Sequence, residues 1–127
     1  MTMKKKILVV DDDHKIVEII FTILASEGYD VRTLVHPKVI YNEISLFKPD
    51  LIILDGEMGD FDGRDICRRL KAAVETSHIP ILMLSFSQDL ASIKEVCNVD
   101  DFLKKPFDVD ELITKVALFV DAFSSKR

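Results

Sequence analysis

The sequence predicts an α/β fold of the doubly wound type, with helices on both faces of an open parallel sheet. Short apolar runs typical of buried strands alternate with longer segments of helical periodicity along the whole chain. The chain has 127 residues, which is enough for one domain with a substantial core and no metal or disulfide to hold it together. The mean hydropathy of +0.17 favours a compact domain over disorder. We therefore expect residues 1–127 to form a single domain of five βα units.

The expected strands are short and apolar. Three of them are uninterrupted runs of Ile, Leu, Val and Met, as in strands buried on both faces of a parallel sheet. The second strand is more mixed in composition, and the last is a short apolar piece. We place the strands at Ile7–Val10, Tyr29–Leu34, Leu51–Leu54, Ile81–Leu84 and Phe102–Leu103.

The segments between the strands carry helix start and stop signals. Pro37 suits the first position of a helix. Asp62 and Asp108 each precede an acidic residue at the spacing of a capping box, and Gly28 suits the position just after a helix. We place the helices at His14–Glu27, Pro37–Phe47, Gly63–Val74, Ser87–Cys97 and Val109–Phe123.

The first helix has a wider apolar arc than packing on a sheet requires. One edge of this arc contains Val17 and Phe21, one helical turn apart. Two interpretations are equally open. Either neighbouring segments cover this edge, or it is partly exposed and helps to dock a helical partner.

Charge and composition exclude several classes of protein. A net charge of −5 argues against direct nucleic-acid binding by this domain. No apolar run approaches the roughly 20 residues of a membrane span, and the N-terminal pattern does not fit a signal peptide, so we expect a cytoplasmic protein. Cys67 and Cys97 form no CxxC motif and are interpreted as reduced residues that pack against helices.

Polar residues follow four of the predicted strands at the point where each strand ends. They are Asp11 with Asp12 and Asp13, then Asp55, then Ser85, and finally Lys105 beside Lys104. Since the carboxyl ends of parallel strands share one edge of the sheet, where ligands bind, these side chains should converge on one pocket.

The converging side chains suit Mg²⁺-dependent phosphoryl transfer. The carboxylates of Asp11, Asp12 and Asp55 repel one another and need a cation or shared protons. Oxygen ligands of this kind suit Mg²⁺. Lys105 supplies a positive charge and Ser85 a hydroxyl group for a phosphoryl oxygen, and phosphoryl transfer depends mainly on such positioning and charge neutralisation. Each residue alone has an ordinary explanation, as a helix cap, a small strand-end residue or a surface charge, but their joint placement favours a site.

In these motifs the chain resembles the receiver domain of response regulators, of the chemotaxis-regulator (CheY-like) type, over essentially its whole length. The resemblance implies a three-layer, flavodoxin-like (βα)5 fold whose five parallel strands have the order 2-1-3-4-5. The motifs that carry it are Val9-Val10-Asp11-Asp12, Pro49-Asp50-Leu51-Ile52-Ile53-Leu54-Asp55, Asp62-Gly63, Leu84-Ser85 and Lys105-Pro106-Phe107.

The resemblance implies that Asp55 is the phosphoacceptor of a two-component or phosphorelay system. The donor would be a phosphohistidine on a histidine kinase or a histidine phosphotransfer protein. Asp12 and Asp55 would bind Mg²⁺, or alternatively Mn²⁺, together with the main-chain carbonyl of Glu57, and Asp11 would act through a metal-bound water. Such a domain is a signalling switch that catalyses its own phosphorylation and dephosphorylation rather than a conventional enzyme.

The resemblance also implies a conformational switch. Ser85 would move toward the phosphoryl group, Lys105 would pair with it, and Phe102 would turn into the core. The surface made by the predicted helix Ser87–Cys97, the last strand and the last helix would then change for a downstream output protein or domain. A cis Lys105–Pro106 bond is a further feature that the family implies.

Three residues depart from the family pattern. Gly59 stands where the family often has proline, which should loosen the loop after Asp55. Glu57 adds a carboxylate that would either strengthen metal binding or repel an incoming anion. Phe86 replaces a small residue after Ser85, so that its ring would obstruct small phosphodonors or shield the phosphorylated aspartate from water.

Two alternatives belong to other functional classes. A receiver-like module that binds partners without phosphorylation would account for Phe86 and Glu57. A phosphatase of the haloacid-dehalogenase type would use Asp11 as its nucleophile, although the short chain leaves no room for a cap insertion. The length fits both a stand-alone protein and the first domain of a longer regulator.

Overall fold

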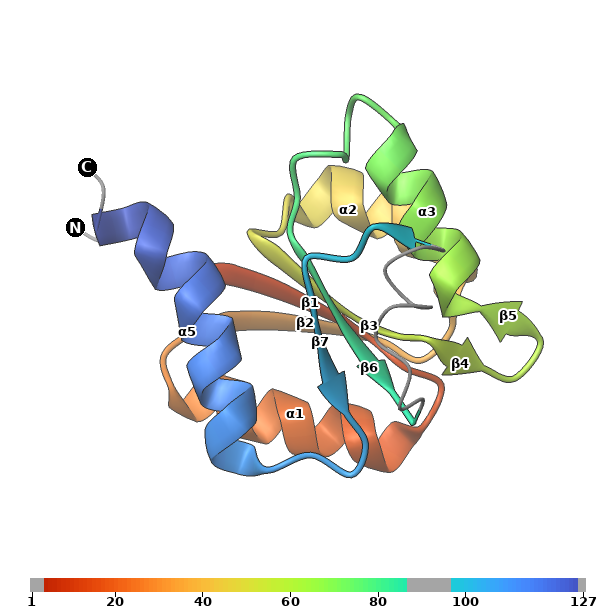
Figure 1. Ribbon diagram of the computed structural model, residues 1–127. Coiled ribbons are helices and arrows are strands. Elements are labelled where there is room, and N and C mark those ends of the chain that lie inside the picture. The colour runs from red at the N-terminus through yellow and green to blue at the C-terminus, as the bar shows by residue number, and fades with distance from the viewer. Residues whose placement is uncertain (1–3, 87–96, 126–127) are drawn as a thin grey trace.

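A central five-stranded parallel sheet organises the fold, with the strand order β2-β1-β3-β6-β7 (Figure 1). The computed structural model describes residues 4–86 and 97–125. The sheet strands are β1 (Lys6–Val10), β2 (Asp30–Leu34), β3 (Leu51–Asp55), β6 (Ile81–Ser85) and β7 (Asp101–Lys104). Counted along the chain these are the first to the fifth parallel strands, so the predicted order 2-1-3-4-5 is confirmed.

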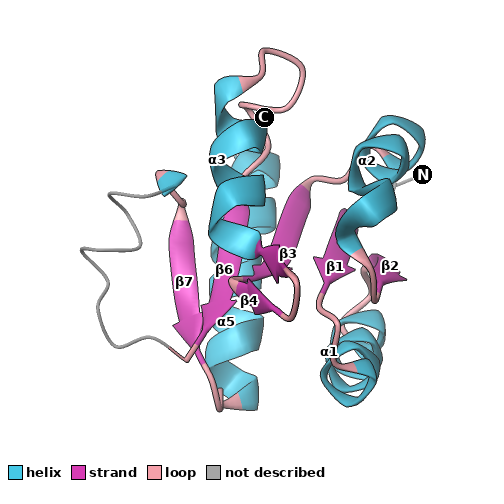
Figure 2. Cartoon of the chain, turned by 90° about the vertical axis from the view of Figure 1, so that its right-hand side faces the viewer, coloured by secondary structure: helices cyan, strands magenta, loops and turns pink. Residues whose placement is uncertain are grey.

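Helices cover both faces of the sheet, as Figures 1 and 2 show from two directions. The helical segments are α1 (His14–Ser26), the 3-10 turn η1 (Pro37–Val39), α2 (Ile40–Phe47), α3 (Gly63–Ala72) and α5 (Val109–Ser125). Every residue of β3 and β6 is buried. This is the burial expected for central strands between two helical layers.

Alternation along the strands divides the interior into two cores. Leu8 and Ile52 face α2 and α3, whose buried side chains include Ile44 and Leu70. Successive side chains of a strand point to opposite faces, so Ile7, Val9, Leu51 and Ile53 belong to the other core. There they meet Ile20 and Leu24 of α1 and Leu112, Val116 and Val120 of α5.

The helix starts agree with the predicted signals, whereas α1 ends at Ser26 instead of Glu27 and α5 ends at Ser125 instead of Phe123. The side chain of Asp62 accepts a hydrogen bond from Arg64 N at the start of α3, and Gly28 after α1 has a φ of +95°. The segment predicted as one helix over Pro37–Phe47 begins as η1. The third helix ends at Ala72 instead of Val74 because Ala73 turns extended and the Thr76 hydroxyl donates to the carbonyl of Leu70. The predicted helix Ser87–Cys97 lies, apart from Cys97, outside the described residues.

The apolar edge of α1 is only partly as expected. Of the two interpretations left open, coverage holds for Val17, which is buried with 6% of its surface exposed. Phe21 is 43% exposed, and Ile19 beside it is exposed too. The surplus apolar surface of α1 therefore lies on Ile19 and Phe21, and a role in docking a helical partner stays a prediction.

Cys67 and Cys97 are buried and reduced, and the Cys67 thiol donates to the carbonyl oxygen of Cys97 at 3.2 Å. Their predicted role as small packing residues is confirmed. No helix within the described part of the chain is long and apolar enough to cross a membrane.

Candidate functional site

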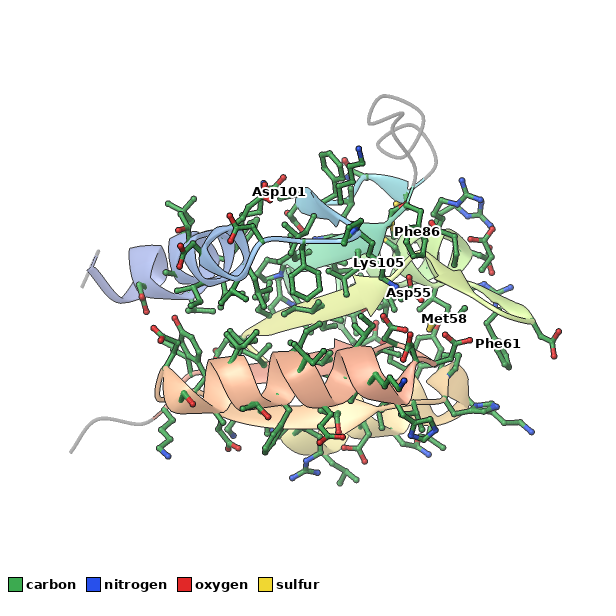
Figure 3. The ribbon with its side chains drawn as sticks, turned by 90° about the horizontal axis from the view of Figure 1, so that it is seen from below. Asp55, Met58, Phe61, Phe86, Asp101 and Lys105 are labelled. Atoms are coloured by element: carbon green, nitrogen blue, oxygen red, sulfur yellow. The ribbon has the colours of Figure 1, made fainter. Side chains whose placement is uncertain are left out.

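The site is built at the carboxyl edge of the sheet, where four strands end together. Asp55 is the last residue of β3 and Ser85 the last of β6, while Asp11 and Lys105 directly follow β1 and β7. Backbone hydrogen bonds continue the ladder past the strands, from Asp11 N to Leu34 O and from Lys105 N to Ser85 O. These bonds fix where each side chain starts. Figure 3 shows Asp55 and Lys105 together at this edge.

Lys105 joins two of the predicted carboxylates. Its ammonium lies 3.0 Å from Asp11 Oδ2 and 3.0 Å from Asp55 Oδ1. All three side chains are buried. One positive charge thus faces two buried carboxylates, and the exposed Asp12 adds a third at the rim.

Burial perturbs the acid strength of Asp55 more than the neighbouring charges do. Burial raises the pKa of Asp55 to about 6, and the negative charge of Asp11 acts in the same direction. The hydrogen bond from Lys105 opposes both effects without cancelling them. Burial also disfavours the charge of Lys105, but hydrogen bonds to the two aspartates outweigh it and leave the pKa of Lys105 above its ordinary value.

The three aspartates form a group suited to a divalent cation. Carboxylate oxygens of Asp11, Asp12 and Asp55 all lie within 4.8 Å of one another. Asp55 Oδ1 accepts hydrogen bonds from Lys105 and from Glu57 N, whereas Asp55 Oδ2 is buried and has no hydrogen-bond partner among the described residues. A buried anionic oxygen without a donor is costly. A hard cation with oxygen ligands fits this position.

Glu57 makes contacts that the sequence did not predict. Its Oε2 accepts a hydrogen bond from Ser85 Oγ at 2.7 Å, and its Oε1 accepts one from Phe86 N at 3.1 Å. The Glu57 carboxylate is therefore hydrogen-bonded to the end of β6, and it does not belong to the carboxylate cluster of Asp11, Asp12 and Asp55. The main-chain carbonyl of Glu57 stays a predicted metal ligand.

Phe86 lies close to Lys105 at the site, and its predicted role as an obstruction or shield stays a prediction (Figure 3). Its side chain is 64% exposed, and Lys105 Nζ lies 5.3 Å from the centre of its ring. Phe102 is partly buried and packs against the core beneath α2 and α3, with Lys115 Nζ 6.0 Å from its ring. Its predicted switch role depends on movement and stays a prediction. The expected cis bond between Lys105 and Pro106 is present.

The loop after Asp55 is more ordered in its hydrogen bonding than its glycines suggested. It forms a small antiparallel hairpin of β4 (Glu57–Met58) and β5 (Phe61–Asp62). Gly59 has a φ of +50°, a conformation that proline cannot adopt. The looser loop predicted from Gly59 stays untested.

Gly63 packs closely against the backbone of the site, although in the sequence it was recognised only as part of the motif Asp62-Gly63. A Cβ atom at Gly63 would lie 1.8 Å from the carbonyl oxygen of Asp55. Gly63 N also donates to Gly56 O at 3.1 Å. The start of α3 thus packs directly on the backbone of the candidate phosphoacceptor. The sequence feature that could have indicated this close packing is the glycine directly after the helix cap Asp62.

A large cavity lies away from these residues. Its volume is about 880 Å³, and its lining includes Lys5, Pro49 and Ile79 at the amino ends of the strands. None of the clustered aspartates, Ser85 or Lys105 lines it. The chemistry of the carboxyl edge therefore marks the site better than cavity size does.

Comparisons with known proteins agree with this geometry. The DNA-binding response regulator MtrA of Mycolicibacterium smegmatis is 33% identical over 91% of this chain and 50% of its own length. The regulator RpaA of Synechocystis is 35% identical over 87% of this chain and 47% of its own length, so the chain spans about half of these curated relatives. The signal receiver domain of a histidine kinase from Syntrophus aciditrophicus has a TM-score of 0.85 at 30% identity, covering 93% of this chain and 91% of that one.

A sequence model of the response regulator receiver domain matches residues 7–117. That match includes all four strand ends that form the site. The chain belongs to the response regulator receiver domain family, the receiving modules of two-component signalling systems.

Proposed function

We propose that Asp55 accepts a phosphoryl group from a phosphohistidine on a histidine kinase or histidine phosphotransfer protein. The observation that carries this proposal is the environment of its carboxylate. Oδ1 is held by Lys105 at 3.0 Å, and Oδ2 is buried without a partner in the described residues. Lys105 thus orients the carboxylate through Oδ1, while Oδ2 has no hydrogen-bond partner among the described residues and can bond to a ligand.

The chemistry follows from these contacts. A carboxylate oxygen of Asp55 attacks phosphorus, an O–P bond forms, and the N–P bond of the phosphohistidine breaks to leave histidine on the donor. Lys105 offsets negative charge near the transferred group, and Ser85 offers its hydroxyl to a phosphoryl oxygen. When bound by Asp11, Asp12 and Asp55, Mg²⁺ or Mn²⁺ supplies positive charge against the incoming anion.

The proposed output is a changed surface rather than a released product. Ser85 approaches the phosphoryl group, Phe102 turns inward, and the face that includes β7 and α5 changes its shape for an output protein or domain. The names of the relatives place DNA binding in those longer proteins. With its net charge of −5 this domain would not contact DNA itself. The domain would also promote loss of its own phosphoryl group by hydrolysis.

The buried reduced cysteines suit a reducing compartment, and we place the protein in the cytoplasm.

Intact mass spectrometry tests the proposal. The protein is incubated with a small phosphodonor such as acetyl phosphate, with and without Mg²⁺, in parallel with Asp55→Asn. A phosphoryl adduct that needs Mg²⁺ and is missing in the variant is the expected result. An unmodified wild type, with Phe86→Ala also unmodified, would reject phosphorylation and favour a module that binds partners without it.

A further inference from the structure

Glu57 is bonded through both of its carboxylate oxygens to the end of β6. The 2.7 Å distance from Ser85 Oγ is short, as for a hydrogen bond to a charged acceptor, and the 3.1 Å distance from Phe86 N is that of an ordinary hydrogen bond. Ser85 is buried and Glu57 is exposed, so the contact reaches from the surface onto a buried hydroxyl. The two bonds span the point where β6 leaves the sheet.

The backbone holds Glu57 in position for this contact. Glu57 pairs with Asp62 across the hairpin, and its N–H donates to Asp55 Oδ1 at 3.3 Å. Met58, the next residue, is buried in the core beneath α2 and α3. The backbone of Glu57 is therefore already fixed, and only its side-chain torsions are ordered when the two hydrogen bonds form.

The same two donors lie beside the candidate phosphoacceptor. In the β3–β6 ladder Asp55 is paired with Leu84, the residue directly before Ser85. A phosphoryl group on Asp55 would therefore extend toward the Ser85 hydroxyl and the Phe86 amide. Each of these groups has a single hydrogen to donate, so neither can fully serve two acceptors at once.

We infer that Glu57 is a positioning residue which holds Ser85 and Phe86 in the unphosphorylated protein and competes with a phosphoryl group on Asp55 for both donors. This inference rests on the proposed function. A phosphoryl group carries a charge of about −1.5 to −2, which also repels the Glu57 carboxylate. Phosphorylation thus requires Glu57 to release the end of β6, and the contact stabilises the unphosphorylated form.

Beryllofluoride is a suitable probe because it adds to a carboxylate as an anionic, tetrahedral mimic of a phosphoryl group. Its affinity in the presence of Mg²⁺ is measured by titration for wild type, Glu57→Ala and Asp60→Ala. Asp60 is an exposed carboxylate on the same hairpin, so its variant controls for the loss of one nearby negative charge. We expect Glu57→Ala to bind beryllofluoride roughly tenfold more tightly, because the competing hydrogen bonds to a charged acceptor are gone, and Asp60→Ala to change little.

Two further measurements separate competition from a general effect. In a Ser85→Ala background the gain from Glu57→Ala should shrink, because one contested donor is gone. Without beryllofluoride, the Phe86 amide should exchange its hydrogen faster in Glu57→Ala than in wild type or Asp60→Ala. Glu57→Gln, which keeps an acceptor oxygen but loses the charge, should fall between wild type and Glu57→Ala in both measurements.

Unchanged or weaker beryllofluoride binding by Glu57→Ala, or an equal gain in Asp60→Ala, would overturn the inference. Absence of binding at Asp55 in every protein, wild type included, would instead reject the proposed function on which it rests. The Phe86 exchange rate reports on the contact itself in either event.

Discussion

Asp55 is buried beside Asp11, and one buried ammonium, that of Lys105, is shared between the two carboxylates. Its pKa of about 6 lies above the ordinary 3.8, so the folded protein binds a proton that the unfolded chain releases. Stability therefore falls as the pH rises through this window, and the full cost is present above about pH 6.

Asp55→Asn should accordingly stabilise the metal-free protein at neutral pH, by up to about 3 kcal/mol. The difference between variant and wild type should shrink as the pH falls from about 6 toward 4, since wild-type Asp55 then becomes neutral. Urea unfolding in a chelator at several pH values measures both effects. A difference that does not depend on pH would contradict the raised pKa.

Phe86 gives a second prediction at the residue scale. Its exposed ring has its centre 5.3 Å from the Lys105 ammonium, which itself contacts Asp55, so the ring would stand beside a small phosphodonor approaching Asp55. Phe86→Ala should speed labelling by acetyl phosphate several-fold and shorten the lifetime of the phosphorylated form. Phe61→Ala is the control, because Phe61 is another exposed ring at this edge that contacts His36 instead. If Phe86→Ala and wild type are phosphorylated at the same rate and also lose the phosphoryl group at the same rate, a gating role for Phe86 is rejected.

At the scale of elements, the contact between α3 and β3 depends on Gly63. Adding a Cβ there would bring it to 1.8 Å from the carbonyl of Asp55, which only a shift of the helix or strand can relieve. Gly63→Ala should therefore destabilise the domain by about 3 kcal/mol or more and reduce phosphorylation of Asp55.

Gly28→Ala provides the comparison, because Gly28 has a positive φ but open space around its Cβ position. Gly28→Ala should lower the free energy of unfolding by about 1 kcal/mol and should leave phosphorylation of Asp55 unchanged. Chemical unfolding of both variants decides the matter. Similar losses for the two glycines would mean that α3 adjusts easily and that the close approach is unimportant.

The arrangement of strands and helices explains which parts of the site could be predicted from the sequence. The strand ends were predictable because parallel topology brings Asp11, Asp55, Ser85 and Lys105 to one edge whatever the side-chain details. The contact of Glu57 was not predictable, since it depends on a hairpin whose two strands, β4 and β5, have only two residues each and therefore show no hydrophobic pattern. The burial of Val17 stayed open for a related reason: periodicity gives the width of an apolar arc but not which edge of it the sheet covers.

At the scale of the whole molecule, metal binding should couple to stability. A cation bound by Asp11, Asp12 and Asp55 binds the folded state alone, because the unfolded chain does not bring these residues together. Mg²⁺ in the millimolar range should raise the melting temperature of the wild type by several degrees.

Asp12→Ala should lose most of this shift, whereas Asp60→Ala should keep it, although both variants remove one exposed carboxylate. Differential scanning fluorimetry at constant ionic strength separates them. The same shift in all three proteins would mean that Mg²⁺ acts only through general screening of the net charge of −5.

The position of β3 has a consequence for how fast different parts of the domain can respond. It lies in the middle of the sheet with all five of its residues buried, so its amide groups should open to solvent only when the whole domain unfolds. Asp55 is therefore attached to the most persistent element, while Glu57 and Phe86 lie on the surface beside it. A phosphoryl group would keep a fixed position for as long as it stays bonded to Asp55, and the surrounding side chains could rearrange around it many times on shorter timescales.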